Sequence, residues 1–169
     1  MIDIRELTVD NTSEFYSLVL ESSKEVPNNF SYTYEEIKEM STEEFTKKFL
    51  IKKSVDDFVL GAFEQEKMLG FIQLKTSKRD RLKHKGEVSK LYISSNNRGK
   101  GVAKKLLEKL IQIAKKIEGL EQLNLMVVSE NIQAINLYLK CGFRIYGIEK
   151  NSMKFENIYT DALCMQLFV

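Results

Sequence analysis

The chain has 169 residues, of which 43% are hydrophobic and 30% are charged, as in a soluble globular protein of about one domain. Its net charge of +2 is too small to indicate nucleic-acid binding, and its apolar runs are far shorter than the roughly 18 residues of a membrane span. Two cysteines and one histidine provide neither a disulfide framework nor, without carboxylates, a four-ligand zinc site. We expect one domain over residues 1–169 that holds no metal. The N-terminus does not resemble a signal peptide, which favours a cytoplasmic protein.

The first third of the chain predicts one strand followed by helices. Residues 2–7 alternate polar and apolar side chains, as a short strand does. Residues 11–24 carry apolar side chains at helical spacing, and a loop over 25–34 follows. A second helical region over 33–51 contains two capping-box sequences, TYEE and STEE, and is expected to break where the second one begins.

The middle of the chain changes to a strand pattern. Residues 57–63 and 68–75 are strand-like and flank EQEK, which predicts a hairpin loop. Residues 86–93 predict a third strand. Residues 101–117 form the clearest helical pattern, with apolar residues on one side and lysines on the other. Residues 123–128 predict a short buried strand.

The last third predicts one helix and two strands. The helix spans 131–141 and stops at Gly142. Strands over 143–149 and 161–169 follow, joined by a connection over 150–160. The resulting order, β-α-α-β-β-β-α-β-α-β-β, combines antiparallel hairpins with one β-α-β crossover. It predicts an α/β fold of the α+β type, with a mixed, mostly antiparallel sheet flanked by helices on both faces.

The loop ISSNNRGKG, which joins the third strand to the long helix, has the features of an anion site. Backbone N–H groups at the positive end of a helix dipole bind anions, and Gly99 and Gly101 let a ligand approach the backbone. A Walker A loop does not fit, because the glycines are too close together and no Ser or Thr follows a lysine. A dinucleotide-binding loop fails at its third glycine, where Lys104 stands. The pattern R-x-x-G-x-A, filled by Arg98, Gly101 and Ala103, does fit, although the loop alone is also compatible with an ordinary helix start.

A second pattern, NIQAINLYLKCGF, follows the strand over 123–128 by a short turn. Asn131 falls in the first turn of the predicted helix. Four residues share its inward face at helical spacing: Ala134, Leu137, Tyr138 and Cys141. In this order, and separated by one strand, the two patterns resemble the loop and the N-x-x-A-x-x-x-Y-x-x-x-G-F motif of the GNAT family of N-acetyltransferases. The resemblance is detailed over about residues 57–149.

The resemblance implies an N-acetyltransferase that transfers an acetyl group directly from acetyl-CoA to a primary amine of a small molecule or a peptide. It implies that three residues of the third strand pair through their backbone with the pantetheine arm of coenzyme A: Leu91, Tyr92 and Ile93. The following loop and helix start would hold the pyrophosphate: Arg98, Gly99, Lys100, Gly101, Val102, Ala103 and Lys104. Asn131 would hydrogen-bond the pantetheine arm. Tyr138, which is protonated at neutral pH, would protonate the departing thiolate.

The general base is left open. Many family members place a carboxylate on the strand before the second motif, but the nearest position here is Met126. Glu87 is the first candidate, acting through water from the start of the third strand, with its side chain expected on the same face as Ser89 and Leu91. His84 and water alone are the alternatives.

Two cysteines do not favour an acetyl-cysteine intermediate. Cys141 would lie at a helix C-terminus, which raises the pKa of a thiol, and Cys164 on an apolar strand. We therefore expect direct transfer in a ternary complex.

The sequence leaves the acceptor amine, the acyl preference and the choice between monomer and homodimer open. The loops over 25–34 and 150–160 are expected to shape the acceptor pocket. Residues 78–85 contain five Lys or Arg; they are first interpreted as a solvated connection, and alternatively as a site for an acidic substrate or the 3′-phosphate of coenzyme A. RNA binding is not favoured, because no aromatic residues are interleaved. The alternative function is a non-catalytic acyl-CoA-binding or sensor module.

Overall fold

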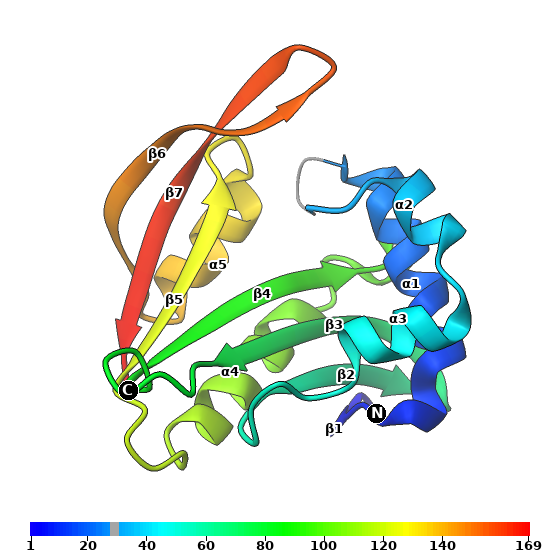
Figure 1. Cartoon of the computed structure of the whole chain (residues 1–169), viewed down its shortest axis with the longest axis horizontal. Coiled ribbons are helices and arrows are strands. Elements are labelled where there is room, and N and C mark those ends of the chain that lie inside the picture. Colours follow the sequence, from blue (N-terminus) through cyan, green and yellow to red (C-terminus); the bar gives the residue numbers. More distant parts are fainter. Residues whose placement is uncertain (28–30) are drawn as a thin grey trace.

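A seven-stranded sheet with the order β1-β2-β3-β4-β5-β7-β6 organises the computed structural model, which describes residues 1–27 and 31–169 (Figure 1). The strands are β1 (Asp3–Glu6), β2 (Phe58–Glu64), β3 (Lys67–Thr76), β4 (Lys85–Ile93), β5 (Gln122–Val128), β6 (Arg144–Phe155) and β7 (Ile158–Phe168). The helices are α1 (Thr12–Glu25), α2 (Tyr34–Glu39), α3 (Thr42–Phe49), α4 (Val102–Ala114) and α5 (Ile132–Lys140). Neighbouring strands are antiparallel except β4 and β5, which confirms the predicted mixed, mostly antiparallel sheet.

Helices cover both faces of the sheet, as predicted. On one face α4 and α5 pack against the strands, and Leu106 and Leu110 of α4 are fully buried with Leu123 of β5. On the other face α1, α2 and α3 enclose a second apolar cluster, in which the Phe15 and Phe71 rings meet edge to face at 5.0 Å. These two apolar layers fix which side of each strand is available to a ligand.

The predicted helical region over 33–51 is two helices, each with the predicted capping box. The backbone N–H of Glu36 donates to Thr33 Oγ1 at 3.2 Å, and the Thr33 N–H donates to the Glu36 carboxylate at 2.7 Å. Ser41 and Glu44 repeat this arrangement at α3. Residues 28–30 of the predicted loop over 25–34 lie outside the described residues.

β4 and β5 pair only at one end, and this is the feature that positions the site. Their parallel pairing is confined to Lys85, Gly86 and Glu87 of β4. Beyond Glu87 the two strands diverge, as Figure 1 shows for the green and yellow arrows. The remaining residues of β4 keep β3 as a partner on one edge, while their other edge faces the opening between β4 and β5.

A bulge in β4 overturns one prediction about the face of Glu87. The register with β3 shifts between Phe71 and Gln73, and Lys90 has a positive φ of 55°. The extra residue reverses the alternation of side chains along the strand. Leu91 consequently packs in the layer of α4 and α5, on the opposite face from Glu87.

The C-terminal strands are longer than predicted. β6 and β7 form one hairpin joined by Glu156 and Asn157, both with positive φ, so the connection predicted over 150–160 is wrong. The strand predicted over 143–149 extends as β6 to Phe155, and most of its residues are exposed. The EQEK loop likewise narrows to a two-residue turn, and the predicted helix over 101–117 ends earlier, at Ala114.

Candidate active site

The N-terminus of α4 presents unengaged backbone N–H groups, as the loop pattern predicted. Gly99 and Gly101 have φ of 74° and 77°, and a Cβ at either position would meet no atom within 4 Å. Gly101 is the N-cap and offers no side chain to the helix. The first backbone bond of the helix is Lys105 N–H to Gly101 O, at 3.1 Å. The N–H groups before it therefore point from a 13-residue helix into an open loop, which is the arrangement that binds phosphate.

Arg98 is tied to α1 rather than projecting freely from this loop. Its Nη2 lies 2.6 Å from the Glu25 carboxylate, and its Nε donates to the Ile93 carbonyl at 3.0 Å. Lys100 donates to Asn97 Oδ1 at 3.1 Å. The ion pair of Arg98 with Glu25 thus holds the loop against α1.

Tyr92 makes the other contact with α1, which sequence reasoning missed. Its hydroxyl hydrogen-bonds Glu21 at 2.8 Å and also Glu25. Burial, reinforced by these two carboxylates, raises the pKa of Tyr92. The two glutamates stand four residues apart on one side of α1, which is the only sign of the contact in the sequence.

The backbone of residues 91–93, which is predicted to pair with the pantetheine arm, has β3 as its partner on one edge. Phe71 and Gly70 of β3 pair with Tyr92 and Ile93 along one edge. A Cβ at Gly70 would approach the Tyr92 carbonyl to 2.5 Å, so glycine is required for this close pairing. The other edge has no β5 partner, because β5 has already diverged.

Tyr138 lies on α5 with its ring in the core. It is 7% exposed, and its ring meets Phe143 edge to face at 5.9 Å. Burial raises the pKa of Tyr138. The phenol therefore keeps its proton over the whole neutral range, and burial also makes it a weaker acid than a free tyrosine. The inward face predicted for Ala134, Leu137 and Cys141 is confirmed, since all three pack on the same apolar layer.

Asn131 is the N-cap of α5 and not part of its first turn. Its Oδ1 accepts the Ala134 N–H at 3.1 Å. This side-chain bond to the helix start is the usual role of Asn in an N-cap. It leaves the side-chain NH2 group as a donor toward solvent or a ligand.

Glu87 stands at the point where β4 and β5 begin to diverge. It is exposed, and it pairs in register with Lys75 of β3 and Asn124 of β5. Glu87 and Tyr138 belong to opposite faces of the sheet. Met126 of β5 is exposed, and His84 is held by its backbone carbonyl, which accepts from Glu121 and Gln122.

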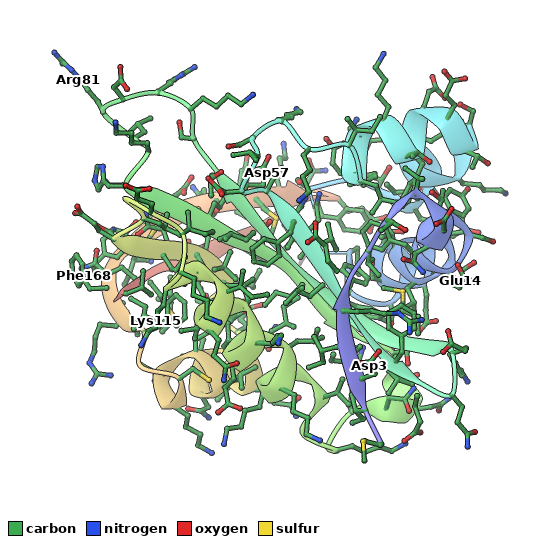
Figure 2. The ribbon with its side chains drawn as sticks, turned by 90° about the horizontal axis from the view of Figure 1, so that it is seen from below. Asp3, Glu14, Asp57, Arg81, Lys115 and Phe168 are labelled. Carbon is green, nitrogen blue, oxygen red and sulfur yellow. The ribbon has the colours of Figure 1, made fainter. Side chains whose placement is uncertain are left out.

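The basic stretch over 78–85 lies at the other end of β4 from the α4 loop. Figure 2 shows Arg81 on a connection that projects from a corner of the molecule. The nine residues of β4 separate the two ends by roughly 26 Å, at about 3.3 Å per residue. A phosphate beside the α4 loop is therefore out of reach of this stretch, whose residues 78–82 are exposed.

Neither cysteine suits covalent catalysis. Both are free thiols. Burial, together with Glu108, raises the pKa of Cys141, as predicted in direction, although burial contributes more than any charge. Cys164 lies within β7, paired in register with Met126 of β5 and Gly147 of β6.

Neither a metal centre nor a membrane span occurs within residues 1–27 and 31–169. These residues contain no group of three or more His, Cys, Asp or Glu side chains arranged to hold a metal ion. None of the helices in this part of the chain combines the length and apolarity needed to cross a membrane.

Known proteins share both the sequence pattern and the fold. The family model of the acetyltransferase (GNAT) domain matches residues 16–164. Spermidine N(1)-acetyltransferase of Thermoplasma acidophilum is 27% identical over 164 residues, covering 94% of this chain and 98% of that protein. Streptothricin acetyltransferase of Escherichia coli is 32% identical over 96 residues, covering 56% of this chain and 51% of that protein.

Solved structures agree with this match. A GNAT-family acetyltransferase from Streptococcus pneumoniae superposes with a TM-score of 0.89 at 25% identity, covering 100% of both chains. A putative acetyltransferase from Salmonella typhimurium, solved with its cofactor acetyl-CoA, has the same fold, with a TM-score of 0.85 at 18% identity over 99% of this chain and 93% of that one. Because the family model matches residues 16–164, which is most of this chain, the chain belongs to the GNAT family of N-acetyltransferases.

Proposed function

We propose that the protein transfers the acetyl group of acetyl-CoA directly to a primary amine in a ternary complex. The observation that carries the proposal is the divergence of β4 from β5 beside an unengaged α4 N-terminus. An unpaired strand edge and an anion site then lie next to each other, which suits a ligand with a peptide-like arm and a pyrophosphate. The acetyl-CoA-bound Salmonella typhimurium neighbour supports this choice of ligand.

The binding residues follow from this placement. The backbone of residues 91–93 would pair with the pantetheine amides, and the N–H groups of residues 99–104 would hold the pyrophosphate. The free NH2 group of Asn131 would donate to the same arm, because its Oδ1 is already used by the helix. Arg98 would act through position, by holding the loop against Glu25.

The chemistry needs three groups. Glu87 takes a proton from the acceptor ammonium, directly or through water, because only the neutral amine has a lone pair to attack the thioester carbon. A backbone N–H near Tyr92 or Ile93 stabilises the tetrahedral oxyanion. As the carbon–nitrogen bond forms and the carbon–sulfur bond breaks, Tyr138 gives its proton to the leaving thiolate, and the second proton that the nitrogen loses on becoming an amide returns to the Tyr138 phenolate through water. Glu87 and Tyr138 lie on opposite faces of the sheet, which supports separate base and acid roles.

The first experiment measures release of the coenzyme A thiol from acetyl-CoA with a panel of amines, amino acids and short peptides. Tyr138→Phe should lower kcat by at least about tenfold, since positioned general acids contribute roughly 10²–10⁴-fold. Tyr146→Phe is the matched control, because Tyr146 is exposed on β6 and should keep full activity. Binding of acetyl-CoA without thiol release for any acceptor would favour the sensor module, and failure to bind acetyl-CoA would overturn the phosphate-loop assignment.

A further inference from the structure

Four lysines gather on the face of β4 that is turned toward α3. Lys90, at the bulge, places its Nζ 4.2 Å from the centroid of the Phe49 ring. Lys48 of α3 places its Nζ 4.2 Å from the Tyr32 ring. Lys53 and Lys75 lie close enough for their charges to act on Lys90. We call Lys48, Lys53, Lys75 and Lys90 the lysine cluster.

The lysine cluster lies between two parts of the molecule that concern the acceptor amine. The Tyr32 ring, in the loop expected to shape the acceptor pocket, meets Phe49 at 5.6 Å. Lys75 pairs in register with Glu87, the proposed base. A group bound at the cluster would therefore be held beside the residue that receives the amine proton.

The carboxylates around the cluster, among them Glu6 and Asp57, which line a cavity with three of its lysines, offset part of its charge. Glu87 is the one carboxylate among the described residues whose charge acts on Lys90 to favour its protonated form. Asp57 accepts from the backbone N–H groups of Ser54 and Thr76 at 3.0 and 2.7 Å, and Glu6 pairs with Lys52 at 2.7 Å.

Glu44, which lies one turn from Lys48, is bound by the N–H and hydroxyl of Ser41. The charge of Lys48 nevertheless acts on Glu44, so Glu44 offsets part of the charge of Lys48, while Glu87 is the carboxylate among the described residues whose charge acts on Lys90.

Lys90 itself is held in an unfavourable state. It is largely buried, and its backbone has a positive φ. Among the described residues, burial and neighbouring charges, and no hydrogen bond, shift the pKa of its ammonium group. Burial and the charge of Lys75 lower the pKa of Lys90 to about 7. Backbone strain and the burial of a cation both cost stability, and proteins keep such features mainly at sites where a ligand uses them.

Two buried oxygen atoms next to the cluster also lack partners. Gln73 is 6% exposed, and its Oε1 has no hydrogen bond with residues 1–27 or 31–169. Ser89 Oγ, on the neighbouring strand in register with Gln73, has none with these residues either. Gln73 lines a small cavity together with Lys48, Lys53 and Lys75. Buried polar atoms are nearly always paired in native proteins. Gln73 Oε1 can accept from an N–H donor such as the ammonium of the acceptor, and Ser89 Oγ can donate to an anionic group.

We propose that the lysine cluster binds an anionic group, a carboxylate or a phosphate, carried by the amine that the enzyme acetylates. The inference rests on the proposed transferase function and adds the chemical class of its acceptor. It distinguishes this chain from a polyamine acetyltransferase, since four ammonium groups repel a polycation as strongly as they attract an anion.

The test uses acceptors that differ only in charge. β-Alanine is compared with β-alaninamide, and O-phosphoethanolamine with ethanolamine, while spermidine serves as the polycation. For each amine we would measure kcat/KM by thiol release and, separately, the Kd by calorimetry in the presence of coenzyme A. The two anionic members distinguish a carboxylate from a phosphate. Lys90→Met and Lys48→Met are the test variants, and Lys47→Met, exposed on the same helix, is the control.

We expect at least one anionic member to bind and react at least about tenfold better than its neutral twin. Lys90→Met and Lys48→Met should bring that ratio close to one, whereas Lys47→Met should keep it. Lys48 is exposed, so its variant tests the proposal even if Lys90→Met folds poorly.

Preference for a neutral twin or for spermidine would overturn the inference while leaving acetyl transfer intact. Tighter binding of an anionic member with no thiol release from any amine would support the anion site and overturn the transferase mechanism.

Discussion

Lys90 shows at the scale of one residue how a functional site costs stability. Its ammonium lies in a largely buried position at a backbone bulge, where a lysine is less favourable than an apolar residue. The folded pKa of about 7 lies below the ordinary value of 10.5. Below pH 7 both folded and unfolded chains hold the proton, so the burial cost is fully present. Between pH 7 and 10.5 the unfolded chain holds more protons, and stability contributed by this group rises with pH.

The variant Lys90→Met should therefore raise the melting temperature at pH 6, by at least about 3 °C for a chain of this size. The gain should be smaller at pH 9.5, where the folded lysine is already neutral. Differential scanning calorimetry at both pH values checks this, with Lys67→Met as an exposed control. Equal gains at the two pH values would show that the buried ammonium is not the cause.

Asn131 has two roles that substitutions can separate. Asn131→Asp keeps an oxygen that accepts the Ala134 N–H but removes both side-chain N–H donors. It should preserve the melting temperature and raise the KM for acetyl-CoA. Asn131→Ala should raise the KM for acetyl-CoA and also lower the stability by about 1 kcal/mol, because the helix cap is missing. Thermal melts and steady-state kinetics separate these effects, and an unchanged KM in both variants would remove Asn131 from the binding site.

At the scale of one element, the start of α4 combines backbone conformation with ligand binding. Gly101 and Gly119 have nearly the same φ, 77° and 76°, and a Cβ added at either glycine would have no atom within 4 Å. Alanine at either position should cost roughly 1–2 kcal/mol in backbone strain. Only Gly101 lies at the proposed pyrophosphate site.

We expect Gly101→Ala to raise the KM for acetyl-CoA by at least about fivefold, because a side chain there displaces the amides from the phosphate. Gly119→Ala should lose similar stability and keep its KM. Chemical denaturation and kinetics on the two variants give the comparison. A KM increase of the same size in Gly119→Ala would attribute the effect to general destabilisation.

Across the whole molecule, the separation of β4 from β5 determines where chemistry can occur. Apolar layers cover both faces of the first four strands, but the opening between the two halves of the sheet has no strand to close it. Glu87 lies on one face of the sheet and Tyr138 on the other. Such a divergence is a property of two strands and their neighbours together, so no local pattern in β4 or β5 announces it.

Local patterns determined most of the elements and the two binding motifs. The capping boxes at Thr33 and Ser41 depend on residues three apart, and Gly101 and Asn131 act within one turn of their helices. Interactions of this range can be read from a sequence, because the partners are neighbours along the chain. The long β6–β7 hairpin was missed because its exposed residues do not alternate cleanly in polarity.

The sequence by itself thus determined the family and the mixed sheet, and it predicts the residues of the phosphate loop. Only the tertiary structure decided the features that depend on contacts between residues far apart in the sequence. The bulge at Lys90 turns Leu91 away from Glu87, and Arg98 pairs with Glu25 across 73 residues. The lysine cluster also forms only when β3, β4 and α3 meet. Coulomb interaction and burial depend on distance in space, which a sequence specifies only after the chain has folded.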